Sequence, residues 1–298
     1  MKILVTGGKG AVGSKLMRKL EELGHEAISY DILDGQDMFD LEALEGAIIG
    51  VDAVYHLAAE ANLNHMRDIE GAHRGSLLNI GGTENVAYLC AKHRKWMLYV
   101  STLCVYGDTL EHPEREDTTL PNPSEIYAAT KYAGEWVVVG YGKSLDLPYT
   151  ILRIATPYGP GTRDAMAVHV FFKQALKGQP ITVHGDGSQE RTMTYLDDVI
   201  EGSIAPLMHK EAAMKQIFNI STDERTSVFS MAAQVKELTG SRSQITFTPK
   251  RPHDTMVERV DAGKAKRLLG WEAKVTFFEG LKRTHEWMRS REAAGELQ

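Results

Sequence analysis

Short apolar runs alternate along the first half of the chain with segments that have the periodicity of helices. The runs are KILVT from Lys2, AISYD from Ala27, AVYHL from Ala53, MLYVS from Met97 and YTILRI from Tyr149. After the first run, Val12, Leu16 and Leu20 recur at the spacing of one helix face. Continuous apolar strands separated by helices are typical of a parallel sheet with both faces covered. The pattern therefore predicts an α/β fold with a doubly wound parallel sheet.

The second half of the chain has a different pattern. Beyond the fifth run the alternation gives way to short elements separated by turn-rich stretches, such as HGDGSQ at 184–189 and TPKRPHD at 248–254. We expect a first domain over residues 1–165 and a smaller C-terminal lobe over 166–298, with a segment near 192–220 that returns to the first domain. No long linker separates the two parts, so they should pack around a shared cleft.

Composition and charge narrow the possible partners. Apolar residues make up 43% of the chain and no window reaches the roughly 20 apolar residues of a membrane span, so we expect a water-soluble protein. With 34 basic residues against 40 acidic ones, we expect a small-molecule partner and no nucleic acid. The first run begins at the second residue without a secretory leader, which favours a cytoplasmic protein. Cys90 and Cys104 lack metal-site spacing and are expected to be buried free thiols, so no metal site is predicted.

A glycine-rich turn links the first strand to the first helix. In TGGKGAVG, Gly7 permits a tight turn, Gly10 lets the backbone approach a pyrophosphate, and Gly13 permits close packing of the helix. The helix N-terminus adds free N–H donors. Asp31 ends the second run, where its carboxylate can bind a ribose diol and repel a 2′-phosphate. We therefore expect a Rossmann-type domain that binds NAD rather than NADP, and a carboxylate that only caps its own turn is the alternative for Asp31.

Two residues of the loop after the second strand are weaker candidates for the cofactor site. Asp37 and Met38 would lie near the adenine if the cofactor crosses the strand ends. Solvated loop residues are the alternative for both.

Tyr127 and Lys131 form a candidate catalytic pair. They stand four residues apart in EIYAATKYAGEWVVV, a stretch with helical character, so both side chains lie on one helix face. An ammonium near a phenol favours the phenolate, which can act as a base. The motif STLCVYGD, residues 101–108, follows the fourth strand and places a hydroxyl at the sheet edge where α/β proteins bind ligands. A solvated helix face is the alternative for the pair taken alone.

Further motifs extend through both halves of the chain. They are HLAA at 56–59, NIGGTENV at 79–86, LRIATPYGPG at 152–161, GDGSQERTMTYLDDV at 185–199, and RPHD followed by VDAGKAKRLLGW. Together with the glycine loop, Asp31 and the Tyr–Lys pair, they resemble the extended short-chain dehydrogenase/reductase family, in its branch of NAD-dependent nucleotide-sugar epimerases and dehydratases. The motifs cover nearly the whole chain in the family's order.

The resemblance implies a role for each matching position. The residues implied to contact NAD are Gly7, Gly10, Gly13, Asp31, Leu57, Ala58, Ala59, Tyr127 and Lys131. Those implied to be catalytic are Thr102, Tyr127 and Lys131. The implied substrate contacts are Thr102, Thr156 at a position that is usually Asn, and Arg191 and Arg251, whose forked donors suit a diphosphate. The resemblance also implies a homodimer that pairs through the helices of NIGGTENVAYLCA and EIYAATKYAGEWVVV.

Leu103 and Cys104 bear on which of the family's reactions is expected. The dehydratases carry Asp and Glu after the catalytic Thr, and the decarboxylases carry Glu at the place of Cys104. Leucine has no proton to give and a thiol is a weak donor, so both activities are disfavoured. We expect an NAD-dependent epimerase of a nucleotide sugar, acting at C4 of a UDP-hexose as UDP-glucose/UDP-galactose 4-epimerases do. An NAD(P)H-dependent 4-ketosugar reductase is the main alternative, followed by a dehydratase and a non-catalytic NAD-binding regulator.

Overall fold

A six-stranded sheet is the centre of the larger part of the computed structural model, which describes residues 1–107, 109–251 and 256–296. The strands are β1 (Lys2–Thr6), β2 (Glu26–Tyr30), β3 (Ala53–His56), β4 (Trp96–Thr102), β5 (Tyr149–Ile154) and β10 (Gln216–Ile220). Their order is β10–β5–β4–β3–β1–β2, and each neighbouring pair is parallel. The predicted doubly wound parallel sheet is confirmed, and so are the five strands expected from the apolar runs.

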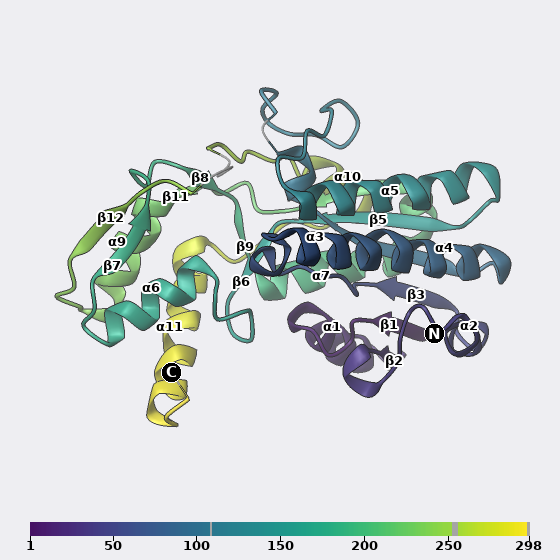
Figure 1. Ribbon diagram of the computed structural model, residues 1–298, viewed down its shortest axis with the longest axis horizontal. Coiled ribbons are helices and arrows are strands. Elements are labelled where there is room, and N and C mark those ends of the chain that lie inside the picture. Colours follow the sequence, from purple (N-terminus) through teal and green to yellow (C-terminus); the bar gives the residue numbers. More distant parts are fainter. Residues whose placement is uncertain (108, 252–255, 297–298) are drawn as a thin grey trace.

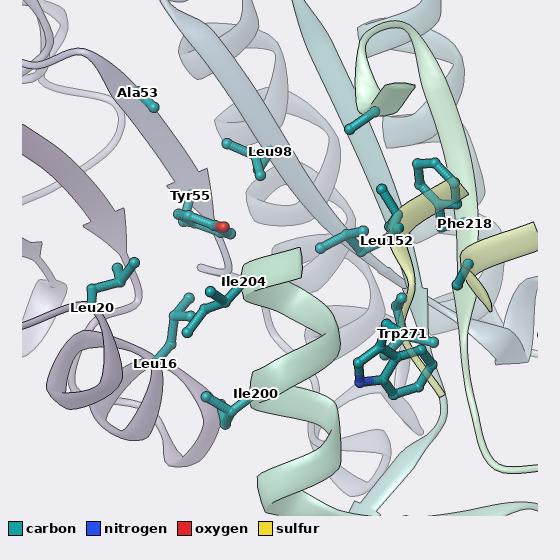
Figure 2. Close-up of a cluster of buried hydrophobic side chains, with 14 of the residues drawn as sticks. Leu16, Leu20, Ala53, Tyr55, Leu98, Leu152, Ile200, Ile204, Phe218 and Trp271 are labelled. Carbon is teal, nitrogen blue, oxygen red and sulfur yellow. The ribbon is translucent and has the colours of Figure 1, made fainter. Parts of the chain in front are cut away.

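Helices on one face of the sheet bury alternate side chains of the strands. This face is covered by α1 (Ala11–Glu22), α7 (Leu196–Met208) and α10 (Gly263–Leu269). Figure 2 shows Leu16 of α1 and Ile204 of α7 beside Tyr55 of β3. Burial of each such side chain stabilises the fold by roughly 1.5 to 3 kcal/mol. The strands read as continuous apolar runs because the opposite face is covered as well.

The second face carries the helices that position the candidate catalytic pair. It is covered by α2 (Leu41–Ile49), α4 (Thr83–Lys92) and α5 (Ile126–Ser144). A preceding helix, α3 (Ile69–Ser76), continues through the π-helical turn η3 (Leu77–Gly82) into α4. Figure 1 shows α3, α4 and α5 along one side of the sheet. Leu4 of β1 packs here while its neighbours Ile3 and Val5 pack on the first face, as the two-residue period of a strand requires.

A smaller lobe lies beyond the carboxyl ends of the strands, at the left of Figure 1. Its core lies among α6 (Ala167–Leu176), α9 (Val228–Thr239), α11 (Phe277–Ala293) and the parallel pair β7 (Ile181–His184) and β12 (Ile245–Thr248). Between β7 and α9 the chain returns to the larger part, where β10 is a strand of the large sheet and α7 packs on one face of it. The expected domain boundary at residue 165 stays a prediction.

The remaining elements are short. They are β6 (Thr156–Tyr158), β8 (Glu190–Arg191), β9 (Met193–Tyr195), β11 (Thr226–Ser227), α8 (Lys210–Ala213), and the 3-10 turns η1 (Ile32–Asp34), η2 (Leu63–Met66) and η4 (Leu103–Tyr106). The parallel pairing of β6 with β9 places Thr156 beside Met193. Within the described residues, no helix has the length and apolar character needed to cross a membrane.

Candidate active site

The glycine loop has the geometry of a phosphate cradle at the N-terminus of α1. Gly7 adopts a φ of +71°, a conformation that side chains rarely accept. A Cβ atom on Gly13 would lie 2.1 Å from the Gly7 carbonyl oxygen, so the helix could not pack this close to the loop with any other residue. The Gly10 N–H donates to the same carbonyl at 3.0 Å. These contacts leave the first N–H groups of α1 directed out of its N-terminus, as dinucleotide binding requires.

The carboxylate of Asp31 lies beside this loop at the end of β2. It accepts the backbone N–H of Lys9 at 2.9 Å and that of Leu33 at 3.0 Å. Asp31 therefore caps its own turn, which was the alternative interpretation, and also fastens the glycine loop. A carboxylate has about four acceptor positions, so two remain for a ribose diol, and both roles fit the same side chain.

The two weaker cofactor candidates differ in their surroundings. Asp37 is exposed, and its carboxylate accepts the N–H of Phe39 at 2.9 Å. Met38 is buried in the core of the second sheet face. The expected contact of each with the adenine stays a prediction.

A cavity of about 490 Å³ extends from the glycine loop along the carboxyl ends of the strands. Its walls include Gly7, Gly10, Gly13, Leu57, Ala59, Thr102, Cys104, Tyr127, Lys131, Thr156 and Arg163. The neighbouring Ala58 directs its N–H to the Thr6 hydroxyl at 3.3 Å, which holds the HLAA segment against β1. The cavity thus brings together most of the residues expected to contact cofactor and to carry chemistry.

Thr102 and Tyr127 meet at the floor of this cavity. Thr102 is the last residue of β4, where its hydroxyl accepts the N–H of Cys104 at 3.2 Å and so caps η4. The Thr102 hydroxyl lies near enough to the Tyr127 phenol to favour its ionised form. Burial raises the pKa of Tyr127 well above its usual range, and the charge of Arg163 and the Thr102 hydroxyl oppose that rise.

Lys131 lies one helical turn after Tyr127 and is buried. Its Nζ lies 4.2 Å from the centre of the Tyr99 ring. Burial lowers the pKa of Lys131 to about 7, while the Glu135 carboxylate opposes the shift. Burial favours the neutral form of both Tyr127 and Lys131, so it opposes the expected effect of the lysine charge on the phenol, which stays a prediction.

The expected substrate residues of the smaller lobe line a second cavity of about 340 Å³. Arg191 and Arg251 form part of its wall, together with apolar side chains such as Phe171. Thr156 and Met166 line both cavities, so the two spaces adjoin. The Arg191 Nη1 donates to the Glu190 carbonyl at 2.8 Å, which directs the guanidinium. The RPHD motif continues into Pro252, His253 and Asp254, which lie outside the described residues.

Two residues that line the first cavity, Cys104 and Arg163, and one whose charge reaches it, Glu258, were not singled out correctly from the sequence. Cys104 was expected to be buried like Cys90, but it opens onto the cavity. Desolvation of the thiol by the surrounding protein raises the pKa of Cys104 to about 11. Arg163 lines the cavity and donates to the Ala61 carbonyl at 2.6 Å across it. Glu258 accepts a hydrogen bond from the Thr192 hydroxyl, and its charge acts on the Cys104 thiol. Burial raises the pKa of Glu258. Arg163 follows the GPG of a quoted motif, whereas nothing in the local sequence marks Glu258.

The parallel sheet, the glycine cradle and the Tyr–Lys pair at the strand ends define a dinucleotide-dependent α/β enzyme. Residues 3–221 match the model of the NAD dependent epimerase/dehydratase family. The chain belongs to that family, and the resemblance found in its motifs is confirmed.

Individual relatives fall into more than one reaction class. UDP-glucuronic acid decarboxylase 1 of Arabidopsis thaliana is 32% identical, and the match covers 98% of this chain and 70% of the relative. UDP-glucose 4-epimerase of Thermotoga maritima, solved with UDP-glucose, has a TM-score of 0.91 at 30% identity, covering 98% of this chain and 100% of that one. UDP-glucuronic acid 4-epimerase of Bacillus cereus, solved with UDP-glucuronic acid and NAD, has a TM-score of 0.89 at 28% identity, covering 97% and 99%.

NAD is the cofactor of this chain's family, and the described residues fit it. The glycine cradle leaves room for a pyrophosphate at the start of α1, and Asp31 retains free acceptor positions beside it. The chain is thus an NAD-dependent enzyme of the group that contains nucleotide-sugar epimerases, decarboxylases and dehydratases. The roles of individual site residues stay predictions.

Proposed function

We propose that this protein is an NAD-dependent epimerase that inverts C4 of a UDP-linked hexose. The observation that carries the proposal is the composition of the cavity floor. Thr102, Tyr127 and Lys131 line the cavity together, but the two positions after Thr102 offer no carboxyl group. Leu103 is buried in the core, and Cys104 presents a thiol whose raised pKa makes it a poor proton donor to a leaving group. Epimerisation needs a base and a hydride acceptor and does not need a leaving-group acid.

The proposed chemistry divides between the bound cofactor and three side chains. NAD, when bound, accepts the hydride from C4 and later returns it to the other face of the sugar. Tyr127 takes the O4 proton as C4 is oxidised and gives it back on reduction, and the nearby Thr102 hydroxyl favours the phenolate. Protonated Lys131 favours the phenolate by its charge. Because the proton and the hydride are both returned, the enzyme ends each turnover in its starting state.

Turning the 4-keto sugar requires that the nucleotide stays bound while the sugar leaves the catalytic side chains. The second cavity supplies such an anchor, because Arg191 and Arg251 suit a diphosphate and the apolar wall suits a base and ribose. The shared residues Thr156 and Met166 place this anchor directly beside the cavity that contains Tyr127. A substrate held in this way retains room to rotate about its diphosphate.

A 4-ketosugar reductase would use the same residues, and the two functions differ in their cofactor balance. A reductase consumes reduced cofactor with each turnover, whereas an epimerase shows no net change. Decarboxylation of UDP-glucuronic acid is the activity named for several relatives of this chain. The thiol at Cys104 is evidence against decarboxylation, because the decarboxylases that this chain resembles carry Glu at that position. The intact catalytic trio speaks against a non-catalytic regulator.

One experiment separates these functions. The purified protein would be supplied with NAD and, in turn, UDP-glucose, UDP-galactose, UDP-N-acetylglucosamine, UDP-glucuronic acid and dTDP-glucose. Products would be resolved by NMR while the absorbance of reduced nicotinamide is followed. We expect a pair of C4 epimers from at least one UDP-hexose without net reduction. Release of carbon dioxide, formation of a 4-keto-6-deoxy sugar, or no product from any sugar would contradict the proposal.

We also propose that the protein works as a homodimer. Figure 1 shows α3, α4 and α5 along the outside of the sheet. Large apolar side chains are exposed on these helices and on η3, including Trp136 at 56% and Leu77 at 53%. Exposed apolar groups clustered on neighbouring helices are typical of a subunit interface, and a twofold axis through them would form a four-helix bundle.

A further inference from the structure

We propose that Glu135 is a positioning residue whose charge favours the protonated form of the catalytic lysine, with Arg153 as the fixed partner that holds the Glu135 carboxylate. The expected effect on catalytic activity rests on the proposed function. The expected effect of Glu135 on the pKa of Lys131 does not depend on the substrate. The two residues lie in EIYAATKYAGEWVVV and LRIATPYGPG, but no role followed for either from the motifs.

Glu135 and Arg153 form an ion pair with almost no exposure to solvent. Their side chains are 2% and 3% exposed. The Arg153 Nη2 donates to Glu135 Oε2 at 2.7 Å, and Nε donates to Oε1 at 3.0 Å, which is the forked geometry of a strong pair. The Ser101 hydroxyl donates to Oε1 at 2.5 Å. The Glu135 carboxylate, held by three such donors, is the counterion of the buried guanidinium.

Arg153 has a second hydrogen-bond partner besides Glu135, and this contact helps to fix the position of the ion pair. Its Nη1 donates to the Tyr106 hydroxyl at 2.8 Å, and that hydroxyl donates to Asn219 Oδ1 at 2.9 Å. Asn219 ends the chain of contacts on β10, where its amide donates to the backbone carbonyls of Glu114 and Asp261. The Glu135 carboxylate is therefore anchored through strands β4, β5 and β10, and does not depend on α5 alone.

Glu135 lies one turn further along α5 than Lys131. Residues four apart on a helix lie on the same face, and the Glu135 charge raises the pKa of Lys131 against the effect of burial. The other titratable groups around Lys131 are Tyr127 on α5, Tyr99 on β4 and His56 on β3. Burial raises the pKa of both tyrosines and lowers that of His56 to about 3, so all three are neutral near pH 7. Among these groups, Glu135 supplies the negative charge.

The consequence concerns the fraction of Lys131 that carries a proton. With a pKa of about 7, a small change in the local field changes that fraction greatly at neutral pH. Removal of the Glu135 charge lowers the pKa further, so the lysine becomes neutral over most of the working range. A neutral lysine no longer favours the Tyr127 phenolate. The falling limb of the activity against pH should therefore move to lower pH.

The test is a titration of the Lys131 amine by NMR in the NAD-loaded protein labelled with ε-13C-lysine. The Lys131 signal would be assigned by its loss in Lys131→Arg. In Glu135→Gln we expect the apparent pKa of Lys131 to fall by about one pH unit. Because this variant leaves Arg153 unpaired and can destabilise the fold, the double variant Glu135→Gln with Arg153→Met removes both buried charges. It should fold more stably and show the same direction of change.

A matched control comes from Glu84, a carboxylate that accepts the Tyr141 hydroxyl at 2.6 Å. Tyr141 lies ten residues after Lys131, about 15 Å along α5, so Glu84→Gln should leave the Lys131 titration unchanged. Activity gives a second reading: the falling limb of kcat/KM should shift to lower pH in the double variant and return toward wild type in Glu135→Asp, which keeps the charge. A merely structural role would lower activity equally at all pH values.

The outcomes separate this inference from the proposed function. If the Lys131 pKa in the folded double variant equals that of the wild type, the inference is overturned, whatever the enzyme catalyses. If the pKa falls as expected and no nucleotide sugar is turned over by the wild type, the inference stands and the proposed epimerase activity fails. A fall of the pKa together with a shifted activity limb supports both.

Discussion

Replacement of Gly13 by alanine tests the glycine loop as the cofactor cradle. The added Cβ would lie 2.1 Å from the Gly7 carbonyl oxygen and 3.0 Å from the Gly7 carbonyl carbon and the Gly8 Cα. Every one of these atoms belongs to the backbone of the loop, so no side chain can rotate away to make room. Either the loop or the start of α1 has to move by about 1 Å to restore an ordinary contact distance.

The magnitude of the effect follows from the bonds that such a shift disturbs. The Gly10 N–H loses its 3.0 Å bond to the Gly7 carbonyl, which contributes about 0.5 to 1.5 kcal/mol to the native loop. The N–H groups at the helix start lose their alignment with the pyrophosphate, and a hydrogen bond to a charged group is worth about 1.5 to 3 kcal/mol. Loss of one such bond weakens NAD binding roughly 10- to 100-fold, because 1.4 kcal/mol corresponds to a factor of ten.

The assay is calorimetric titration with NAD, with thermal unfolding measured on the same samples. Gly46→Ala is the matched control, because Gly46 lies inside α2 and its added Cβ would have no neighbour within 4 Å. That control should bind NAD as the wild type does and gain about 0.5 to 1 kcal/mol of stability. If folded Gly13→Ala bound NAD within threefold of the wild type, the cradle would not be the cofactor site.

Four further predictions concern catalysis, substrate capture and assembly. Tyr127→Phe should lower kcat by about 10² to 10⁴ while calorimetry shows near-normal NAD and nucleotide-sugar binding. Arg191→Ala should raise KM for the sugar roughly 10-fold or more with a smaller effect on kcat, as steady-state kinetics would show. Glu258→Gln should keep epimerisation within about threefold; a loss of about 100-fold would identify it as an acid that the proposed reaction does not use. Trp136→Glu should convert the dimer to a monomer in light scattering, and a dimer that persists at micromolar concentration would place the interface elsewhere.

The strands were predictable because their burial on both faces leaves an uninterrupted apolar signal in the sequence. Each of the five runs became a strand of the large sheet. The segment near 192–220 that was expected to return to the first domain contains α7 and β10, but the packing of α10 against them was harder to foresee. The helix α10 comes after most of the smaller lobe in the sequence and packs on α7 and β10, and Trp271 belongs to the same cluster. Such contacts depend on tertiary folding, and no local periodicity reports them.

The candidate site divides in the same way. Tyr127 and Lys131 were found because a helix brings residues four apart together, and the glycine loop because its spacing reflects local backbone geometry. The ion pair of Glu135 with Arg153 joins a helix to a strand eighteen residues later, so spacing alone gave no reason to connect them. Cys104 was expected to be buried because most free cysteines are, but its position just beyond a strand end exposes it to the cavity.

The largest difference between expectation and structure concerns charge. From the sequence, the expectation was that the Lys131 ammonium favours the Tyr127 phenolate, and burial was not considered. Burial changes both groups, since it raises the pKa of Tyr127 and lowers that of Lys131 to about 7. With a pKa of about 7, Lys131 carries its proton on only about half of the molecules at neutral pH. Charges outside the pair therefore matter for a working base: Glu135 favours the charged lysine and Arg163 favours the phenolate. The Tyr–Lys motif identifies the reacting groups, and the charges around them influence their protonation.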